Sequence, residues 1–232
     1  MLGRVRMALG RSASGGGIPR EMLPELGKAL APIPAALLVE HFEAEFREVG
    51  GTPHRVDSAS ALRQTLVEIL PEGSSVVLSR NPILARVGIV ETLKRLNCAA
   101  ACWPAEIPAA FGRQCFSAAA GITGADFVLA ESGTLVLTSK TEGSQLASLA
   151  PPIHIALYSR EQVVESLEEI FAGLRIGPEP GEQSASSEGS PGRSTVLITG
   201  SSRTADIEQI SIRGVHGPTQ AHAILIEEAY YI

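Results

Sequence analysis

The sequence predicts an α/β fold in which a mainly parallel sheet lies between two helical layers. Apolar runs of strand length alternate along the chain with segments of helical periodicity, the order that produces parallel sheets. The runs are continuous rather than alternating, which is typical of strands buried on both faces. With 232 residues, 44% of them hydrophobic, the chain is long enough to bury a large core.

The predicted strands are short and rich in Val, Ile, Leu and Ala. They cover residues 75–79, 99–103, 126–130, 134–139, 153–158, 195–199 and 223–226. The predicted helices show apolar residues three or four apart. One helix is expected after Pro34, a second from about Leu62 to Leu70, and three more over residues 83–96, 114–120 and 163–174. Ser159 and Gln162 have the spacing of a capping box just before the last of these helices.

Composition also suggests how the chain is divided. We expect residues 1–52 to form a helical segment that packs on the core, and residues 53–232 to form the α/β domain. Within that domain, residues 177–193 contain no large apolar side chain. Such a segment cannot bury enough surface to offset its conformational entropy, so we expect a mobile linker there.

Charge and hydropathy exclude several classes of function. Nineteen basic against twenty-five acidic side chains give a net charge of -6, which argues against binding to nucleic acid. No apolar run is long enough to span a membrane, and the first ten residues lack the apolar core of a signal peptide. We therefore expect a cytoplasmic protein with no membrane association.

The cysteines and the missing motifs argue against a resident cofactor. The three cysteines, Cys98, Cys102 and Cys115, are too few for an iron–sulfur cluster, which needs about four thiolates. His216 and His222 are six residues apart, too far for a helical metal pair, and His222 has no acidic partner at ligand spacing. The dinucleotide and phosphate-loop motifs are absent. We expect no metal and no cofactor in this chain.

The first candidate site follows the strand at residues 195–199. The segment GSSRTADIE (200–208) places glycine and hydroxyl residues after a strand and before an expected helix start. Backbone N–H groups and a helix dipole there favour an anion, and Arg203 offers a bidentate clamp for carboxylate or phosphate. The predicted ligand-binding residues in this segment are Ser201, Ser202, Arg203, Thr204, Asp206 and Glu208. The alternative is a simple helix cap with a surface arginine.

The second candidate is Glu131, which follows an apolar strand and precedes Ser132-Gly133-Thr134. A carboxylate at a strand end can act as an acid, a base or a nucleophile, with Gly133 and Thr134 as neighbouring ligand-binding residues. The alternative is a hairpin turn with Gly133 at positive φ and Glu131 capping N–H groups. Asp126 is expected to be structural.

The third candidate is His216, which lies in a loop between Gly214 and Gly217. A loop histidine can donate or accept a proton near neutral pH, so His216 joins Glu131 as a tentative catalytic residue and Gly217 joins the ligand-binding residues. We expect Arg203, Glu131 and His216 to meet at the carboxyl end of the sheet, where open parallel sheets bind ligands. The other histidines are expected to be structural or exposed.

These stretches resemble one known family. Residues 121–134 (GITGADFVLAESGT), 202–208 (SRTADIE) and 214–218 (GVHGP) are similar in sequence and order to the LutC/YkgG (LUD-domain) family of lactate-utilisation proteins. The similarity extends from about residue 75 to the C-terminus. The polar insert at residues 177–193 departs from the family pattern.

The resemblance implies a fold like that of the NagB/RpiA/CoA-transferase group and a role in oxidising L-lactate to pyruvate. It further implies a cluster-free accessory subunit that binds a small carboxylate or phosphate, or the iron–sulfur subunits of a lactate-oxidising complex. The alternative is an enzyme: Glu131-Ser132-Gly133 is slightly similar to the Glu-Asn-Gly turn of CoA-transferases, and ATP-dependent ligases share the general fold.

Overall fold

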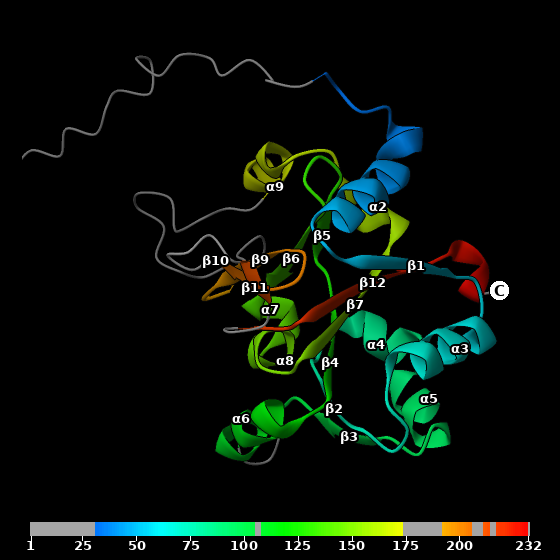
Figure 1. Ribbon diagram of the computed structural model, residues 1–232. Helices are drawn as coiled ribbons and strands as arrows, with labels where there is room; N and C mark the ends of the chain where they lie inside the picture. Colours follow the sequence, from blue (N-terminus) through cyan, green and yellow to red (C-terminus); the bar gives the residue numbers. More distant parts are fainter. Residues whose placement is uncertain (1–30, 105–107, 174–191, 206–210, 214–216, 232) are drawn as a thin grey trace, which may run out of the picture. The chain divides into compact units, whose positions relative to one another are not determined.

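The chain is built around a six-stranded sheet, seen in a computed structural model that describes residues 31–104, 108–173, 192–205, 211–213 and 217–231 (Figure 1). The strand order is β1-β12-β7-β4-β2-β3, and all neighbouring strands run parallel. The strands are β1 (Thr52–Val56), β2 (Ser75–Leu78), β3 (Ala99–Cys102), β4 (Ala120–Gly124), β7 (Ile153–Ser159) and β12 (Gln220–Ile226). The central strands β4 and β7 are buried almost throughout, as strands covered on both faces must be.

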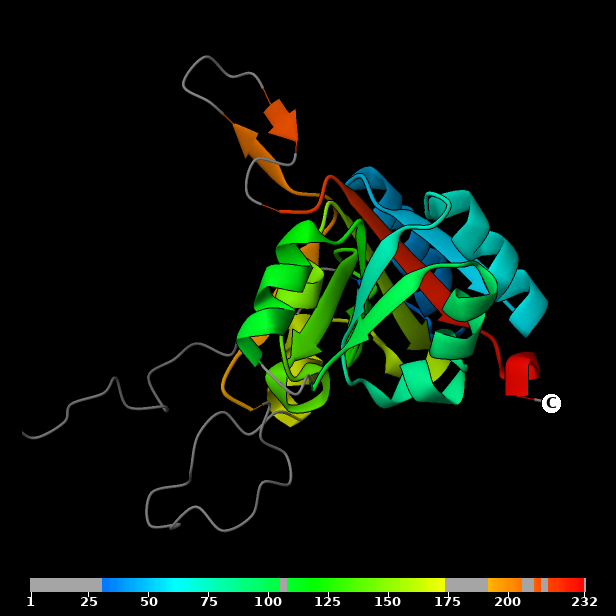
Figure 2. The same ribbon diagram turned by 90° about the horizontal axis from the view of Figure 1, so that it is seen from below.

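One face of this sheet is covered by the helices α3 (Ala59–Ile69), α4 (Pro82–Arg86) and α5 (Ile89–Arg95) (Figures 1 and 2). The α3 side chains Leu62 and Leu66, one turn apart, are completely buried in the same cluster as Ile155 and Ile224 of the sheet. Helix α3 begins where the Ser58 hydroxyl accepts a hydrogen bond from the Ala61 N–H.

The other face carries helix α2 (Leu38–Glu48) and a second, smaller sheet. That sheet has the order β8-β5-β6-β9, in which β6 runs antiparallel to both neighbours and β5 runs parallel to β8. Its strands are β5 (Phe127–Leu129), β6 (Thr134–Thr138), β8 (Val163–Val164) and β9 (Thr195–Thr199). Phe42 of α2 stacks on Phe46 and meets Tyr158 of β7 edge-on, so these rings fasten α2 to the parallel sheet.

The remaining elements are short. They are α6 (Pro108–Ser117), α7 (Ser139–Glu142), α8 (Leu146–Leu149), α9 (Leu167–Gly173), η2 (Ala35–Leu37), η3 (Arg160–Gln162), η4 (Glu228–Tyr231), β10 (Arg203–Ala205) and β11 (Ser211–Arg213). Strands β10 and β11 pair as an antiparallel hairpin (Figure 2). Helix α6 packs near α8, around the buried Phe111 and Ala147. The predicted fold class, a mainly parallel sheet between helices, is confirmed.

Two predicted helices differ from the structure. The predicted helix at 114–120 is the end of α6, and strand β4 begins at Ala120. Two glycines weaken the strand signal of β4, and at Gly121 the small residue is required: a Cβ there would lie 1.7 Å from the Ala147 carbonyl oxygen. The predicted helix at 163–174 starts only at Leu167, because residues 163 and 164 pair with β5. The capping box is present, but it opens only the single turn η3.

Some predictions concern residues outside the described ranges. Residues 1–30 of the predicted N-terminal segment and residues 177–191 of the predicted linker belong to this group. None of the helices within the described ranges has the length and apolar character needed to cross a bilayer.

Candidate functional site

A cavity of about 330 Å³ lies beside strand β9. Strand β9 and the loop that follows it form one wall, and α8 contributes Ser148 and Leu149. His154 of β7 and Ala221 of β12 also lie at the wall, together with Gly217 and Pro218. This volume is at the lower end of the range for small-molecule pockets, about 300–1,000 Å³.

The cavity lies at the amino end of the parallel sheet, the side on which its strands begin. The Ser202 N–H donates to the Pro218 carbonyl, and the Thr219 N–H donates to the Pro152 carbonyl. Pro152 directly precedes β7, and Thr219 directly precedes β12. The sequence-based prediction put the loop after Thr199 at the carboxyl end of the sheet. It is wrong because β9 belongs to the smaller sheet, where it pairs antiparallel with β6, and because the loop after β9 returns to the start of β12.

The expected helix start after Thr199 is also absent from the described residues. Gly200 adopts φ +74°, and the chain then enters strand β10 through Arg203 and Thr204. The helix-dipole argument for an anion therefore does not apply to this loop. The side chains of Arg203 and Thr204 lie outside the described part of the structure.

Three further candidate residues, Asp206, Glu208 and His216, lie wholly outside the described residues. The expected meeting of Arg203, Glu131 and His216 therefore stays a prediction.

Two polar atoms at the cavity wall are buried without a hydrogen-bond partner among the described residues: the Ser201 hydroxyl and the His154 Nδ1. The Ser201 residue is 5% exposed and His154 is completely buried. The other ring nitrogen of His154, Nε2, lies 2.8 Å from the Thr123 hydroxyl. Burial, helped by nearby His222, lowers the pKa of His154 to about 3, so this imidazole is neutral at physiological pH.

The Glu131 turn lies next to the cavity loop, because β6 pairs with β9. The hydroxyl of Thr134 is 2.8 Å from that of Thr199 and 2.9 Å from that of Ser132. Of these, Thr199 lines the cavity. The Glu131 carboxylate is engaged elsewhere: its Oε1 accepts a hydrogen bond of 3.2 Å from the Leu167 N–H, at the first turn of α9. Gly133 has φ +61°, so the geometry is that of the structural alternative, a turn glycine with a capping glutamate.

Two glycines of the candidate segments, Gly133 and Gly200, also allow the backbone of α2 to pack closely against the smaller sheet. A Cβ on Gly133 would lie 2.4 Å from the Phe46 backbone nitrogen, and one on Gly200 would lie 2.1 Å from the Val49 carbonyl oxygen. The α2 backbone thus rests on the ends of β6 and β9. Among the predicted site residues, the structure brings Ser201, Ser202 and Gly217 together at one cavity, and it places Thr134 one hydrogen bond away.

The carboxyl end of the parallel sheet carries a different polar group. Glu142 of α7 is completely buried, and its Oε1 accepts a hydrogen bond of 2.5 Å from the Asn81 amide. Asn81 also caps α4 through the Ile83 N–H. Burial, reinforced by the charge of Asp126, raises the pKa of Glu142 to about 7. As expected, Asp126 is structural: its Oδ2 accepts from the Thr138 N–H and the Thr141 hydroxyl.

A pair of histidines joins β1 to β12 at the same end of the sheet as the cavity. The His54 Nε2 lies 3.1 Å from the His222 Nδ1, and the rings stack. Burial lowers both pKa values, that of His222 to about 4 with a contribution from His54. Within the described ranges, no group of three or more His, Cys, Asp or Glu side chains is arranged to hold a metal ion.

Several cavity residues could not be predicted from the sequence. His154 was expected to be structural or exposed, and the unpartnered Nδ1 depends on which side chains surround it. Leu149 and Leu197, both more than 40% exposed, line the cavity from separate elements. The hydroxyl of Thr199 could have been suspected, since it immediately precedes the glycine of the predicted loop.

The sequence profile of the LUD domain matches residues 39–226. The chain is 32% identical to an uncharacterized protein of Escherichia coli named YkgG over 154 residues, which cover 66% of this chain and 63% of that protein. It is also 32% identical over 180 residues to a protein of Geobacillus kaustophilus named lactate utilization protein C, covering 73% of this chain and 69% of that protein.

A third relative, from Halalkalibacterium halodurans, carries the same name and is 36% identical, but the chain spans only 44% of its length. Among solved structures, a crystal structure of a DUF162 family protein from Deinococcus radiodurans matches with a TM-score of 0.55 and 20% identity. That match covers 84% of this chain and 99% of the other. It shows a shared fold.

Proposed function

Because the chain belongs to the LUD-domain family, we propose that it acts in lactate utilisation, as a cytoplasmic subunit that carries no redox centre. Two of the relatives described above are named lactate utilization protein C, which supports a role in this process. In this proposal the chain binds a small carboxylate or phosphate in the cavity beside β9, and iron–sulfur partner subunits handle the electrons of lactate oxidation.

The positions of the three thiols support the proposal that this chain carries no iron–sulfur cluster. Cys98 is buried among the side chains of α3 and α5, whereas Cys115 is buried in a separate cluster with Phe111. Cys102, on β3, is exposed. Three thiols in three environments do not supply the four ligands of a common cluster. All three are unpaired, which fits a reducing compartment.

The observation that carries the ligand-binding proposal is the pair of unpartnered polar atoms at the cavity wall. A buried polar group without a partner costs about 1–3 kcal/mol, and a ligand that supplies the partner recovers part of that cost. The Ser201 hydroxyl can donate to a carboxylate or phosphate oxygen. The neutral His154 ring offers a further polar atom without adding a charge that must be buried.

Arg203 follows Ser201 by two residues, and we assign it the charge that attracts the anion. Titration calorimetry with L-lactate, pyruvate and inorganic phosphate tests the proposal on the wild-type chain. We expect at least one of them to bind, Arg203→Ala to abolish binding, and Arg203→Lys to restore little, because an ammonium cannot reproduce the bidentate fork. Absence of binding by all three anions would refute the small-anion site.

A further inference from the structure

We infer that a second copy of this chain pairs with the free side of β9, joining the smaller sheets of two protomers around a two-fold axis. This inference goes beyond the proposed function and does not depend on it. It rests on the geometry and sequence of β9 and on the closure of the resulting dimer.

Strand β9 is the last strand of the order β8-β5-β6-β9, and the described residues give it a strand neighbour on one side only. The Ser139 N–H donates to the Ser194 carbonyl, in register with the pairing of Thr138 with Thr195. Hydrogen-bonded pairs alternate along an antiparallel ladder. Val196 and Ile198 therefore direct their backbone groups toward β6, and Thr195, Leu197 and Thr199 direct theirs away from it.

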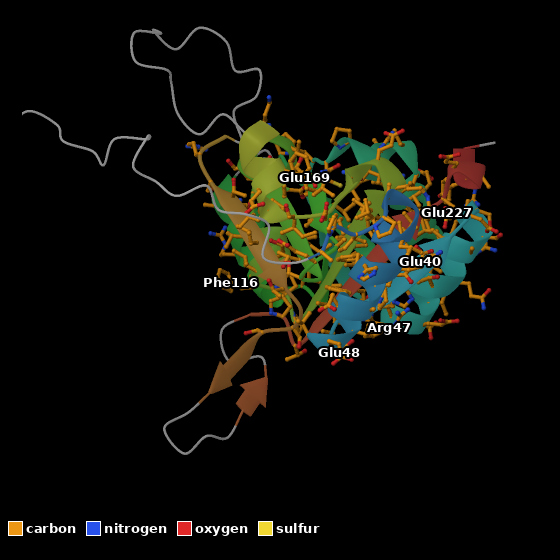
Figure 3. All side chains as sticks on the ribbon, turned by 90° about the horizontal axis from the view of Figure 1, so that it is seen from above. Glu40, Arg47, Glu48, Phe116, Glu169 and Glu227 are labelled. Carbon is orange, nitrogen blue, oxygen red and sulfur yellow. The ribbon has the colours of Figure 1, made fainter. Side chains whose placement is uncertain are left out.

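The free side of β9 faces the cavity, which residues of α8, β7 and β12 also line, rather than packed core. Leu197 is 47% exposed, and the strand runs along the border of the molecule in the view of Figure 3. Consecutive residues from Val196 to Ser202 line the cavity, as expected when a strand presents its backbone side to a hollow. Unpaired N–H and C=O groups on an apolar edge strand are a template for another strand.

The sequence of β9 is suited to pairing with itself. It reads Thr-Val-Leu-Ile-Thr, nearly symmetric about Leu197. A two-fold axis through Leu197 places that residue opposite Leu197 of the second copy, as a hydrogen-bonded pair. Thr195 then faces Thr199 of the second copy, and Val196 faces Ile198. Threonine pairs and aliphatic pairs across strands each contribute roughly 0.2–1 kcal/mol.

Pairing with a second copy also explains why the two edge strands of the smaller sheet differ. Strand β9 contains no Pro and no charged residue, the residues that protect edge strands from pairing. The opposite edge strand, β8, has only two residues, too few to act as a template. Pairing two β9 strands therefore closes the assembly as a symmetric dimer rather than an open filament. It also brings the second copy's Leu197 to the open side of the cavity.

Light scattering coupled to size exclusion tests the inference on the full chain. We expect the wild type to have twice the mass of one chain and Leu197→Lys to have the mass of one. The lysine puts two like charges opposite each other on the axis. Leu37→Lys is the matched control, because Leu37 is 46% exposed and lies in η2. It should remain a dimer.

Cross-linking gives a second readout that does not require the dimer to be disrupted. Facing residues of a hydrogen-bonded pair have Cα atoms about 5.5 Å apart, within disulfide range. In a Cys102→Ser background, Leu197→Cys should form an intermolecular disulfide on the order of a hundredfold faster than Leu37→Cys, owing to its higher effective concentration.

A monomeric wild type, or equal cross-linking rates at the two positions, would overturn the inference, as would a folded Leu197→Lys variant that stays dimeric. If Leu197→Lys fails to fold, the cross-linking rates decide. Because Leu197 also lines the cavity, anion binding is measured on the wild-type chain: a monomeric wild type that binds lactate, pyruvate or phosphate would leave the proposed function intact. A dimer that binds none of them would leave the dimer intact.

Discussion

The two ends of the parallel sheet carry similar polar side chains in different surroundings. At the carboxyl end, Asn81 binds both Glu142 and the first turn of α4, and Asp126 is held by Thr138 and Thr141. At the amino end, Ser201 and His154 keep buried atoms without partners among the described residues, beside a cavity. The carboxyl end also has buried atoms without partners among the described residues, the Glu142 Oε2 and the Tyr158 hydroxyl, but neither residue lines the cavity. The two ends therefore differ in whether such atoms lie beside a cavity that a ligand can enter.

The general rule for open parallel sheets points to the opposite end. Ligands usually bind where the strands finish. In this protein that end holds a polar network built from Asn81 before α4, Asp126 between β4 and β5, and residues of β6 and α7. The cavity instead lies where β7 and β12 begin, because the smaller sheet and α8 leave space there. The following predictions test whether the two ends differ as described.

The largest effect is expected at Gly121, where strand β4 packs against α8. Gly121→Ala would place a Cβ 1.7 Å from the Ala147 carbonyl oxygen of α8. Because the obstacle is backbone, we expect a loss of about 3 kcal/mol or more in the free energy of unfolding by urea. The control is Gly112→Ala in α6, whose Cβ would meet nothing nearer than 3.8 Å. It should be neutral or stabilising.

The buried Glu142 carboxyl, at the carboxyl end of the sheet, should make the folded protein less stable as pH rises. Its pKa in the folded protein is raised to about 7 from an ordinary value of 4.5. Its contribution is therefore fully present below pH 4.5 and is lost as pH rises through 7. Glu142→Gln mimics the protonated acid, so we expect it to exceed the wild type by on the order of 1–3 kcal/mol at alkaline pH and to match it near pH 5.

Urea unfolding at the two pH values measures this difference. Glu48→Gln, at an exposed position of α2, should leave the pH dependence unchanged. A Glu142→Gln variant that follows the wild type at both pH values would show that the buried carboxyl does not titrate near neutrality.

His222, at the amino end of the sheet, should make the folded protein less stable as pH falls. The pKa of His222 is lowered to about 4 from 6.5, so its contribution is fully present above pH 6.5 and is lost as pH falls through 4. His222→Gln should flatten the acid side of the stability curve by at most about 1.4 kcal/mol per pH unit. Glutamine replacement at exposed His41 is the control. An unchanged acid limb in His222→Gln would contradict this assignment.

The smallest effect is expected from the polar segment at residues 177–193. Replacing it with a short Gly/Ser linker should shift the melting temperature by only a few degrees, because it contains no large apolar side chain to bury. Scanning calorimetry measures the shift. Insoluble protein would show that this segment is part of the fold.

The sequence predicted the parts of the fold that depend on local pattern. Strands β2, β7 and β12 are rich in apolar residues, and α2 and α3 have clear helical spacing. Strand β4 was missed because the approach of α8 requires Gly121, a residue with weak strand preference. The candidate site was predicted at the wrong end of the parallel sheet. Nothing in the local sequence of residues 195–199 shows that they pair with β6 rather than with a strand of the parallel sheet.

The candidate site was only partly predictable, for a similar reason. Ser201, Ser202 and Gly217 were identified from their motifs, and they line the cavity. The engagement of Glu131 with α9 depends on a residue 36 positions away, and the unpartnered atom of His154 depends on the packing of three strands. Such properties arise from tertiary contacts rather than from spacing along the chain.

The most direct test compares two serines at opposite ends of the sheet. Ser201 and Ser79 are both 5% exposed, but the Ser79 hydroxyl accepts a hydrogen bond from the Asn81 N–H, whereas the Ser201 hydroxyl has no partner among the described residues. The measurement is the thermal stabilisation of Ser201→Ala and Ser79→Ala by L-lactate, pyruvate and phosphate.

We predict that Ser201→Ala keeps the ligand-free stability within about 1 kcal/mol of the wild type or raises it, and loses the stabilisation by ligand. Ser79→Ala should lose about 1 kcal/mol of ligand-free stability and keep the full response to ligand. An undiminished ligand response in Ser201→Ala, or a response lost in Ser79→Ala alone, would contradict the assignment of the ligand site to the amino end of the sheet.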